Sequence, residues 1–156
     1  MSTTIGSALD GIDTILQGID GPGSYTNDLS GDGRIVWGAG ADLPDPPFLN
    51  LQDVMLETFI EGVPLGMYGR RIRIPIYGEV GIVTDSVTRK DVVKLAAGLL
   101  NDLCIAVEAG QRNFGGVDGV YNVRVEGDSG LALIGDLHAG IIVADLFFEF
   151  RGVTGV

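Results

Sequence analysis

Residues 46–80 read PPFLNLQDVMLETFIEGVPLGMYGRRIRIPIYGEV, and this segment decides how the chain can fold. In its second half, apolar and polar side chains alternate one by one, as they do along a strand with one face in the core. The alternating residues are Ile72, Ile74 and Ile76 on one side, and Arg71, Arg73, Pro75 and Tyr77 on the other. The pattern predicts a half-buried strand over residues 70–80. Because Pro75 has no N–H to donate, we expect it at a sheet edge or a bulge.

A second strand is expected in the first half of the same segment. The preceding residues, ADLPDPP, keep the backbone extended, because a residue before proline avoids the helical region. We therefore predict a strand over residues 48–56. The connection between the two strands is unusually apolar for a loop, and three arginines stand at or just after its end.

This apolar connection is the first candidate for a functional surface. Aromatic and apolar groups beside arginine are enriched where protein surfaces meet. On an acidic chain, such arginines would find partners on identical neighbours, and head-to-tail pairing of that kind closes into rings. The candidate interface residues are Phe59, Ile60, Leu65, Met67, Tyr68, Arg70, Arg71 and Arg73. In the other interpretation, the loop folds back on the core and the arginines line a solvated sheet face.

Two segments have the periodicity of amphipathic helices. Residues 4–19 carry one apolar stripe, which ends at the sequence GPG. Residues 87–109 carry a second stripe. Thr88 and Asp91 are spaced for a capping box at the start of this second helix, with Asp85 or Ser86 as the alternative cap, and Gly110 is a natural stop.

Further extended segments complete the expected sheet. Residues 24–47 are rich in turn residues, and the sequence YTNDLSGDGRIVWG within them, residues 25–38, predicts a short hairpin that turns at SGDG. A strand is predicted over residues 119–126. Its side chains expected on one face are Tyr121, Val123 and Val125. Residues 138–151 have two largely apolar faces, which predicts a central strand or one covered on both sides.

The order helix, strands, helix, strands predicts an α+β fold. We expect one domain over residues 1–156, with an antiparallel or mixed sheet packed against two helices. A chain of this length can bury a sufficient core without disulfides or metals.

The chain is strongly acidic, with a net charge of −11. Proteins that grip phosphates need a basic footprint, so the composition argues against a sequence-reading nucleic-acid binder. An acidic wall that repels phosphate is still compatible with DNA sliding past. The excess of aspartate over glutamate suits a high-salt host, although ordinary phage and bacterial proteins can be equally acidic. With neither a secretory signal nor a membrane span in the sequence, we expect the protein to fold in a cytoplasm.

No cluster of residues points to catalysis, a cofactor or a metal. The glycine-rich loops lack the Lys-Ser/Thr ending of a phosphate-binding loop. Cys104 is the only cysteine and lies in an apolar helical run, which predicts an inert thiol. His138 is the only histidine, and Asp136 stands two residues before it. This pair defines one alternative, a small α+β enzyme; our main expectation is a protein that catalyses no reaction.

An ordered set of segments covers nearly all of the chain. In order, these segments are ILQGIDGPGSYT, DLSGDGRIVWG, LPDPPFLNL, VPLGMYGRRIRIPIYGEVG, DVVKLAAGLLNDLCIAVEA and GIIVADLFFEFRG. Together they resemble the tail terminator (tail completion) proteins of long-tailed bacteriophages and related archaeal viruses. The resemblance rests on the whole series of segments and not on one sharp motif.

The resemblance implies a sheet flanked by helices and a hexameric ring that caps the tail tube. The ring stops tube growth and presents a surface to the head's neck proteins, without catalysis or a cofactor. Gly66, Tyr68 and Arg70 match the loop before the family's long strand, which implies a contact role there.

The implied partners are other copies of the chain, the tail tube protein and a head completion or neck protein. Genomic DNA would pass through the lumen without specific binding. The implied location is the tail or neck of the virion, assembled in the host cytoplasm. A tail tube subunit and a head-to-tail adaptor remain as alternatives within the same particle.

Overall fold

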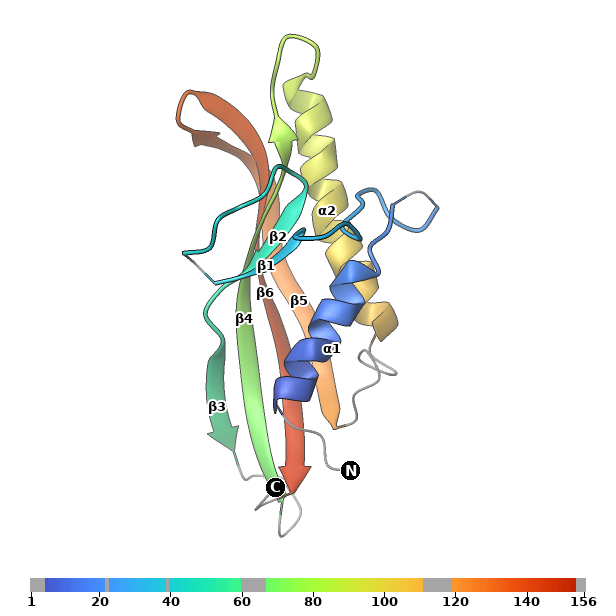
Figure 1. The fold of residues 1–156 in the computed structure, drawn as a ribbon, viewed down its shortest axis with the longest axis vertical. Helices are drawn as coiled ribbons and strands as arrows, with labels where there is room; N and C mark the ends of the chain where they lie inside the picture. Colours follow the sequence, from blue (N-terminus) through green and yellow to red (C-terminus); the bar gives the residue numbers. More distant parts are fainter. Residues whose placement is uncertain (1–4, 22, 39, 60–66, 111–118, 154–156) are drawn as a thin grey trace.

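The computed structural model describes residues 5–21, 23–38, 40–59, 67–110 and 119–153. Within them the chain forms two helices and a six-stranded sheet (Figure 1). The elements are α1 (Ile5–Gln17), β1 (Ile35–Trp37), β2 (Phe48–Leu51), β3 (Met55–Phe59), β4 (Met67–Ile82), α2 (Arg89–Gly110), β5 (Val120–Ile134) and β6 (Leu137–Val153). The predicted α+β class is therefore confirmed.

The two longest strands, β4 and β6, form the centre of the sheet. β6 lies antiparallel between β4 and β5, so the strand predicted over residues 138–151 is central. On its other side, β4 pairs with two short strands in succession, β2 and then β3. β1 joins β2 in parallel, which makes the sheet mixed.

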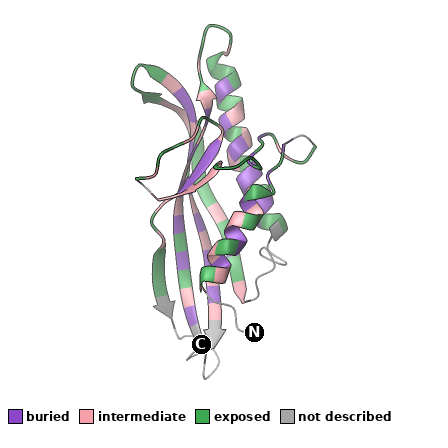
Figure 2. Cartoon of the chain, in the orientation of Figure 1, coloured by how far each residue is buried: buried purple, intermediate pink, exposed green. Residues whose placement is uncertain are grey.

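Both helices lie on the same side of the sheet (Figure 1). α2 packs across β4, β5 and β6, and α1 packs against α2 and β1. Under this layer, alternate residues of the central strands are buried (Figure 2). They include Ile72, Ile74, Ile76, Ile142, Ala144, Leu146, Phe148 and Phe150. We call this side the helix face and the opposite side of the sheet the open face.

The predicted helices are both present, with ends close to those expected. The capping box forms at the start of α2: the Asp91 N–H donates to Thr88 Oγ1 at 3.2 Å. In return, the Thr88 N–H donates to an Asp91 carboxylate oxygen at 3.1 Å. Hydrogen bonds from Thr88 hold the pKa of Asp91 below its ordinary value, because they favour the charged form.

A buried carboxylate on α2 holds the turn that follows α1. Asp102 is 1% exposed and accepts the backbone N–H groups of Thr26 at 2.9 Å and Asn27 at 2.8 Å. The Asn27 side chain donates a third bond at 3.1 Å. Gly98, one turn earlier, makes room for this contact, since a Cβ there would lie 2.8 Å from the Thr26 methyl group. Asp102 thereby accepts hydrogen bonds from backbone N–H groups that lose contact with water when the chain folds.

The prediction of a hairpin over residues 25–38 is wrong. The only part of it in a strand of the described chain, β1, pairs in parallel with β2 and does not fold back on the residues before it. The preceding turns instead bring Asp28 into an isolated bridge with Asp20. The prediction failed because local turn residues do not reveal which distant strand a segment will meet.

The strand predicted over residues 48–56 is interrupted by residues 52–54, which separate β2 from β3. This break explains Pro75, which stands inside β4 and not at the sheet edge. The Pro75 C=O accepts the Gln52 N–H at 2.8 Å, so its missing N–H is on the side of the break. The proline therefore costs no rung of the main β4–β6 ladder.

β5 is longer than predicted and contains a bulge between Tyr121 and Arg124. Within the bulge, Asn122 has a φ of 53°, in the left-handed region. The irregularity places Tyr121 opposite Glu149, on the open face, whereas Val123 is buried. The expectation that Tyr121 shares a face with Val123 is therefore wrong, because a bulge breaks the two-residue period.

Candidate interaction surface on the open face of the sheet

The open face combines charged and aromatic side chains in rows that run across the strands. Strand register sets the rows, because residues directly opposite one another in neighbouring strands point to the same side. The first row contains Glu57, Arg71, Glu149 and Tyr121, and the second contains Met55, Arg73, Phe147 and Arg124. Each row takes one residue from each of β3, β4, β6 and β5.

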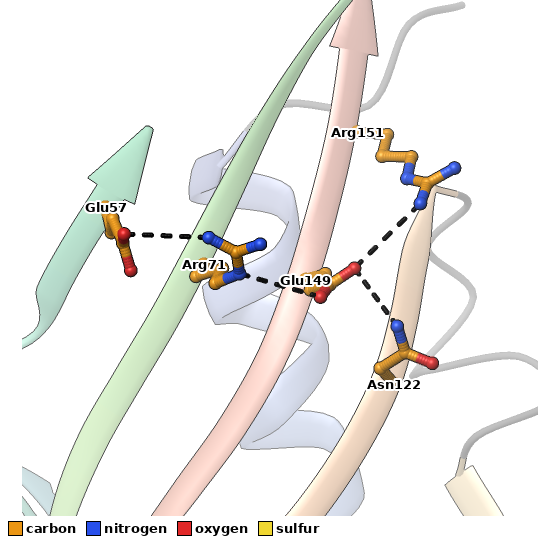
Figure 3. Close-up of polar contacts among 5 residues, drawn as sticks. All are labelled: Glu57, Arg71, Asn122, Glu149 and Arg151. Carbon is orange, nitrogen blue, oxygen red and sulfur yellow. Dashed lines mark hydrogen bonds and ion pairs between the residues drawn. The ribbon is translucent and has the colours of Figure 1, made fainter. Parts of the chain in front are cut away.

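Arg71 lies between two carboxylates in the first row (Figure 3). Its NH1 atom is 3.6 Å from Glu57 Oε1, and its Nε is 3.8 Å from Glu149 Oε1. The Arg71 and Glu57 side chains are both about half exposed or more, at 49% and 69%. Exposed ion pairs contribute little to folding. The charged side chains of this row therefore lie at the surface, and the stability of the core does not depend on them.

Glu149 is the shared acceptor of this network (Figure 3). Its second oxygen accepts a hydrogen bond from Asn122 Nδ2 at 3.0 Å and lies 4.0 Å from Arg151 NH2. The Arg151 guanidinium carbon is 5.2 Å from the centre of the Tyr121 ring, within range of a cation–π contact. The β5 bulge thus supplies both Asn122 and Tyr121 to the same cluster.

In the second row, Phe147 lies beside arginines of both neighbouring strands. The Arg124 guanidinium carbon stands 4.4 Å from the centre of the Phe147 ring. Arg73, the register partner of Phe147 in β4, forms a two-point contact with Asp145, with Nε at 3.0 Å and NH2 at 3.2 Å. Its hydrogen bonds with Asp145 raise the pKa of Arg73, which keeps the guanidinium charged.

A groove of about 470 Å³ runs over these two rows. Its lining residues are Met55, Leu56, Glu57, Arg71, Ile72, Arg73, Arg124 and Phe147. Three of these side chains are arginines, and each one pairs with a carboxylate of the same face: Arg71 with Glu57 and Glu149, Arg73 with Asp145, and Arg124 with Glu126. A smaller hollow of about 170 Å³ adjoins it and reaches Asn122 and Glu149. Apolar groups mixed with arginine are typical of surfaces that bind proteins.

The interface residues predicted from the sequence divide between the two faces. Arg71 and Arg73 lie together on the open face, whereas Arg70 lies opposite Phe150 and so on the other side of β4. The predicted residues at strand ends are Phe59 in β3 and Met67 and Tyr68 in β4. The predicted residues Ile60 and Leu65 lie outside the described residues.

The sequence interpretation missed the other residues of the open-face rows. They are the carboxylates Glu57, Asp145 and Glu149, the aromatic residues Tyr121 and Phe147, and a further arginine, Arg124. A signal was present in the last strand, where Asp145, Glu149 and Arg151 recur with the same two-residue period as Arg71 and Arg73. Reading the two periods together would have paired the strands through their charges.

The residues considered for chemistry lie away from the groove lining. His138 stands at the start of β6, where its C=O accepts the Val83 N–H at 2.9 Å, and Asp136 lies in the preceding turn. Cys104 on α2 is partly buried, and burial raises the pKa of its thiol. Among the described residues, no three His, Cys, Asp or Glu side chains gather closely enough to hold a metal ion.

A scan against models of known protein families matches none of them, and a search of curated proteins finds no significant match. In the described part of the chain, neither helix has the length and apolar character needed to cross a membrane.

Proposed function

We propose that this protein is a structural component of a tailed virus particle, in which it forms a hexameric ring that caps the tail tube and joins the tail to the head. The resemblance to tail terminator proteins along nearly the whole sequence motivates this role. The observation that supports it best is the open face, whose groove is lined by apolar groups and arginines, as protein-binding surfaces are.

The chemistry of the open face favours contact between copies of the chain. The groove combines apolar groups with half-exposed arginines, the mixture typical of protein-binding surfaces. These exposed ion pairs contribute little to folding, so the arginines can exchange their carboxylate partners for those of a second, acidic copy. Contact between the open face of one subunit and a different surface of the next is head-to-tail, and such contacts close into rings when the rotation permits.

The net charge also suits a conduit for DNA. A ring of six such chains would be strongly acidic, and carboxylates around a lumen repel the phosphate backbone. Genomic DNA would therefore pass without being held. The proposed partners at the two ends of the ring are the tail tube protein and a head completion or neck protein.

Self-assembly and tube capping can be tested with one preparation. The mass of the purified protein is measured in solution at low and high salt, and the same samples are mixed with uncapped tail tubes and imaged by negative stain. We expect hexamers, either free or formed on the tube end, and tubes that no longer elongate. Long tubes made of this chain would instead identify a tube subunit, and a monomer that ignores tail tubes would contradict the proposal.

Two other assignments are separated by additional measurements. A head-to-tail adaptor would bind the head side and leave uncapped tubes free to elongate. An enzyme that uses His138 would lose an activity in the His138→Ala variant while its assembly remained intact. The capping assignment predicts that this variant still assembles and still caps tail tubes, because His138 lies outside the groove lining.

A further inference from the structure

The connection between β1 and β2 is a crossover on the open side of the sheet. The two strands are parallel neighbours, so the chain has to return from the end of β1 to the start of β2. The Gly38 N–H donates to the Leu51 C=O at 2.8 Å, which holds the start of the connection beside the far end of β2. In Figure 1 most of this connection lies on the side of the strands away from α1 and α2. We call its residues 40–47 the strap.

Two residues of β2 are buried on the open face, opposite the side that the helices cover. Asn50 lies opposite Tyr77 in the register with β4, so both side chains point to the open face. Phe48, two positions earlier, points the same way, and its ring centre is 6.3 Å from that of Tyr77. Phe48 is 0% exposed and Asn50 is 2% exposed, yet Phe48 lies outside the continuous core beneath the helices. Because both helices lie on the other face, we assign the cover of these side chains to the strap.

The cover leaves one polar atom of Asn50 without a hydrogen bond. Among the described residues, none donates to the buried Asn50 Oδ1. A buried acceptor without a donor costs free energy, because it has lost water and gained no partner. Lifting the strap would return this oxygen to water. The closed position of the strap is therefore destabilised by a residue that it covers.

The main polar fastening of the strap is the side chain of Arg34. Its NH1 atom donates to the Pro47 C=O at 3.3 Å and also to the Asp45 C=O. The Arg34 C=O accepts the Leu49 N–H at 2.9 Å, so the arginine is itself held at the start of β2. In the described chain, no backbone–backbone hydrogen bond reaches residues 42–47. Three of these six residues are prolines, which have no N–H to donate.

We propose that the strap is a cover latched by Arg34, which lifts as a unit while the core beneath the helices stays folded. That core is a separate apolar cluster on the other face of the sheet. Segments with few backbone hydrogen bonds open at a lower free energy than the whole protein. Lifting adds the ring of Phe48 and the amide of Asn50 to the open face, beside Tyr77. The inference does not depend on the proposed ring.

The first test compares two thiol reporters on the same strand, in a Cys104→Ser background. Asn50→Cys lies under the strap, whereas Leu51→Cys, one position later, lies in the core beneath the helices. Their reaction with iodoacetamide is followed at low urea concentrations, at which the protein is folded. We expect Asn50→Cys to react faster than global unfolding allows and with little dependence on urea, because lifting the strap exposes little surface. Leu51→Cys should react with the full urea dependence of unfolding.

The latch is tested by adding Arg34→Ala to the Asn50→Cys protein. The labelling rate should rise by about tenfold, as expected for lost hydrogen bonds from a charged donor, while its urea dependence stays small. Lys90→Ala removes a charge at an exposed position of α2 and should leave the rate unchanged. Two results would overturn the inference: labelling of Asn50→Cys that follows global unfolding, or equal rates with and without Arg34.

A second reporter, Phe48→Cys, tests the part played by the unpaired oxygen of Asn50. Asn50→Leu puts an apolar side chain of similar size under the strap, so the closed position no longer buries an unpaired acceptor. Labelling of Phe48→Cys should then slow by about tenfold. Asn101→Leu makes the same change at an exposed position of α2 and should not slow it. Labelling that is no slower with Asn50→Leu would contradict a strap that lifts from this residue.

Discussion

The two faces of the sheet are built from the same strands but have opposite characters. On β6, Phe148 is 2% exposed beneath the helices, whereas its neighbour Phe147 lies on the open face beside arginines. On β4, Ile72 and Ile74 are buried while Arg71 and Arg73 lie in exposed ion pairs. A one-residue step along either strand thus separates a core position from a surface position.

The two faces therefore have different roles, one in folding and the other in association. Burial of large apolar groups on the helix face supplies the free energy of folding. The half-exposed ion pairs of the open face contribute little to that free energy, so the fold does not require this arrangement. Substitutions on the helix face should therefore affect stability, and those on the open face should affect association.

The largest expected effect comes from the pair of phenylalanines on β6. Phe148→Ala should lower the free energy of unfolding by about 3–5 kcal/mol, because it leaves a cavity in the core. Phe147→Ala should lower it by only about 1 kcal/mol, since it removes one partly exposed ring and its contact with Arg124. Urea unfolding followed by circular dichroism gives both values. Equal losses would refute the distinction between the faces.

A somewhat smaller loss is expected from the polar anchor on α2. Asp102→Ala should cost about 2–4 kcal/mol, because it leaves the N–H groups of Thr26 and Asn27 without their acceptor. The control is Asn101→Ala, at the exposed neighbouring position of the same helix. Thermal unfolding distinguishes the two variants. A stability like that of the control would mean that water replaces the carboxylate.

The helix cap should have a still smaller effect. Thr88→Ala removes the hydroxyl that accepts the Asp91 N–H and should lower the free energy of unfolding by about 1 kcal/mol. Ser86→Ala, two residues earlier and exposed, serves as the reference. Chemical denaturation of the two variants side by side measures the difference. No difference would show that α2 is held by its packing alone.

Tyr77 points to the open side of β4 but is only partly exposed. We therefore expect its ionisation to change the stability of the fold, and only at alkaline pH. Burial, with a smaller contribution from the charge of Glu79, raises the pKa of Tyr77 to about 12, above the ordinary value of 10.0. Because the folded protein disfavours the ionised side chain, the free energy of unfolding keeps its full value below about pH 10 and decreases as the pH rises toward 12. Tyr77→Phe should weaken this alkaline loss, and urea midpoints measured across the range test it. Parallel curves for wild type and variant would contradict it.

Local patterns were sufficient to predict much of the fold. The isoleucines of β4, the capping box of α2 and the long apolar strand β6 were predicted correctly because each depends on nearby residues. The parallel pairing of β1 and the break between β2 and β3 were missed. Both depend on which distant strand a segment meets, and no local period records that.

The candidate surface was predicted only in part for the same reason. Arg71 and Arg73 were identified from the density of charge around them. Their carboxylate partners on β6, Glu149 for Arg71 and Asp145 for Arg73, are more than seventy positions away in the sequence and became visible only through the pairing of β4 with β6. The bulge that moves Tyr121 to the open face has no clear signal in the sequence.

The central claim, that the open face assembles the protein, is tested most directly by the solution mass of a charge-reversed variant. Arg71→Glu with Arg73→Glu places carboxylates beside Glu57, Glu149 and Asp145, so the groove becomes acidic. Lys90→Glu with Lys94→Glu makes the same change in net charge on exposed positions of α2. We predict hexamers for the wild type and the lysine variant, and a folded monomer near 16.4 kDa for the arginine variant. An arginine variant that assembles as well as the wild type would contradict the claim.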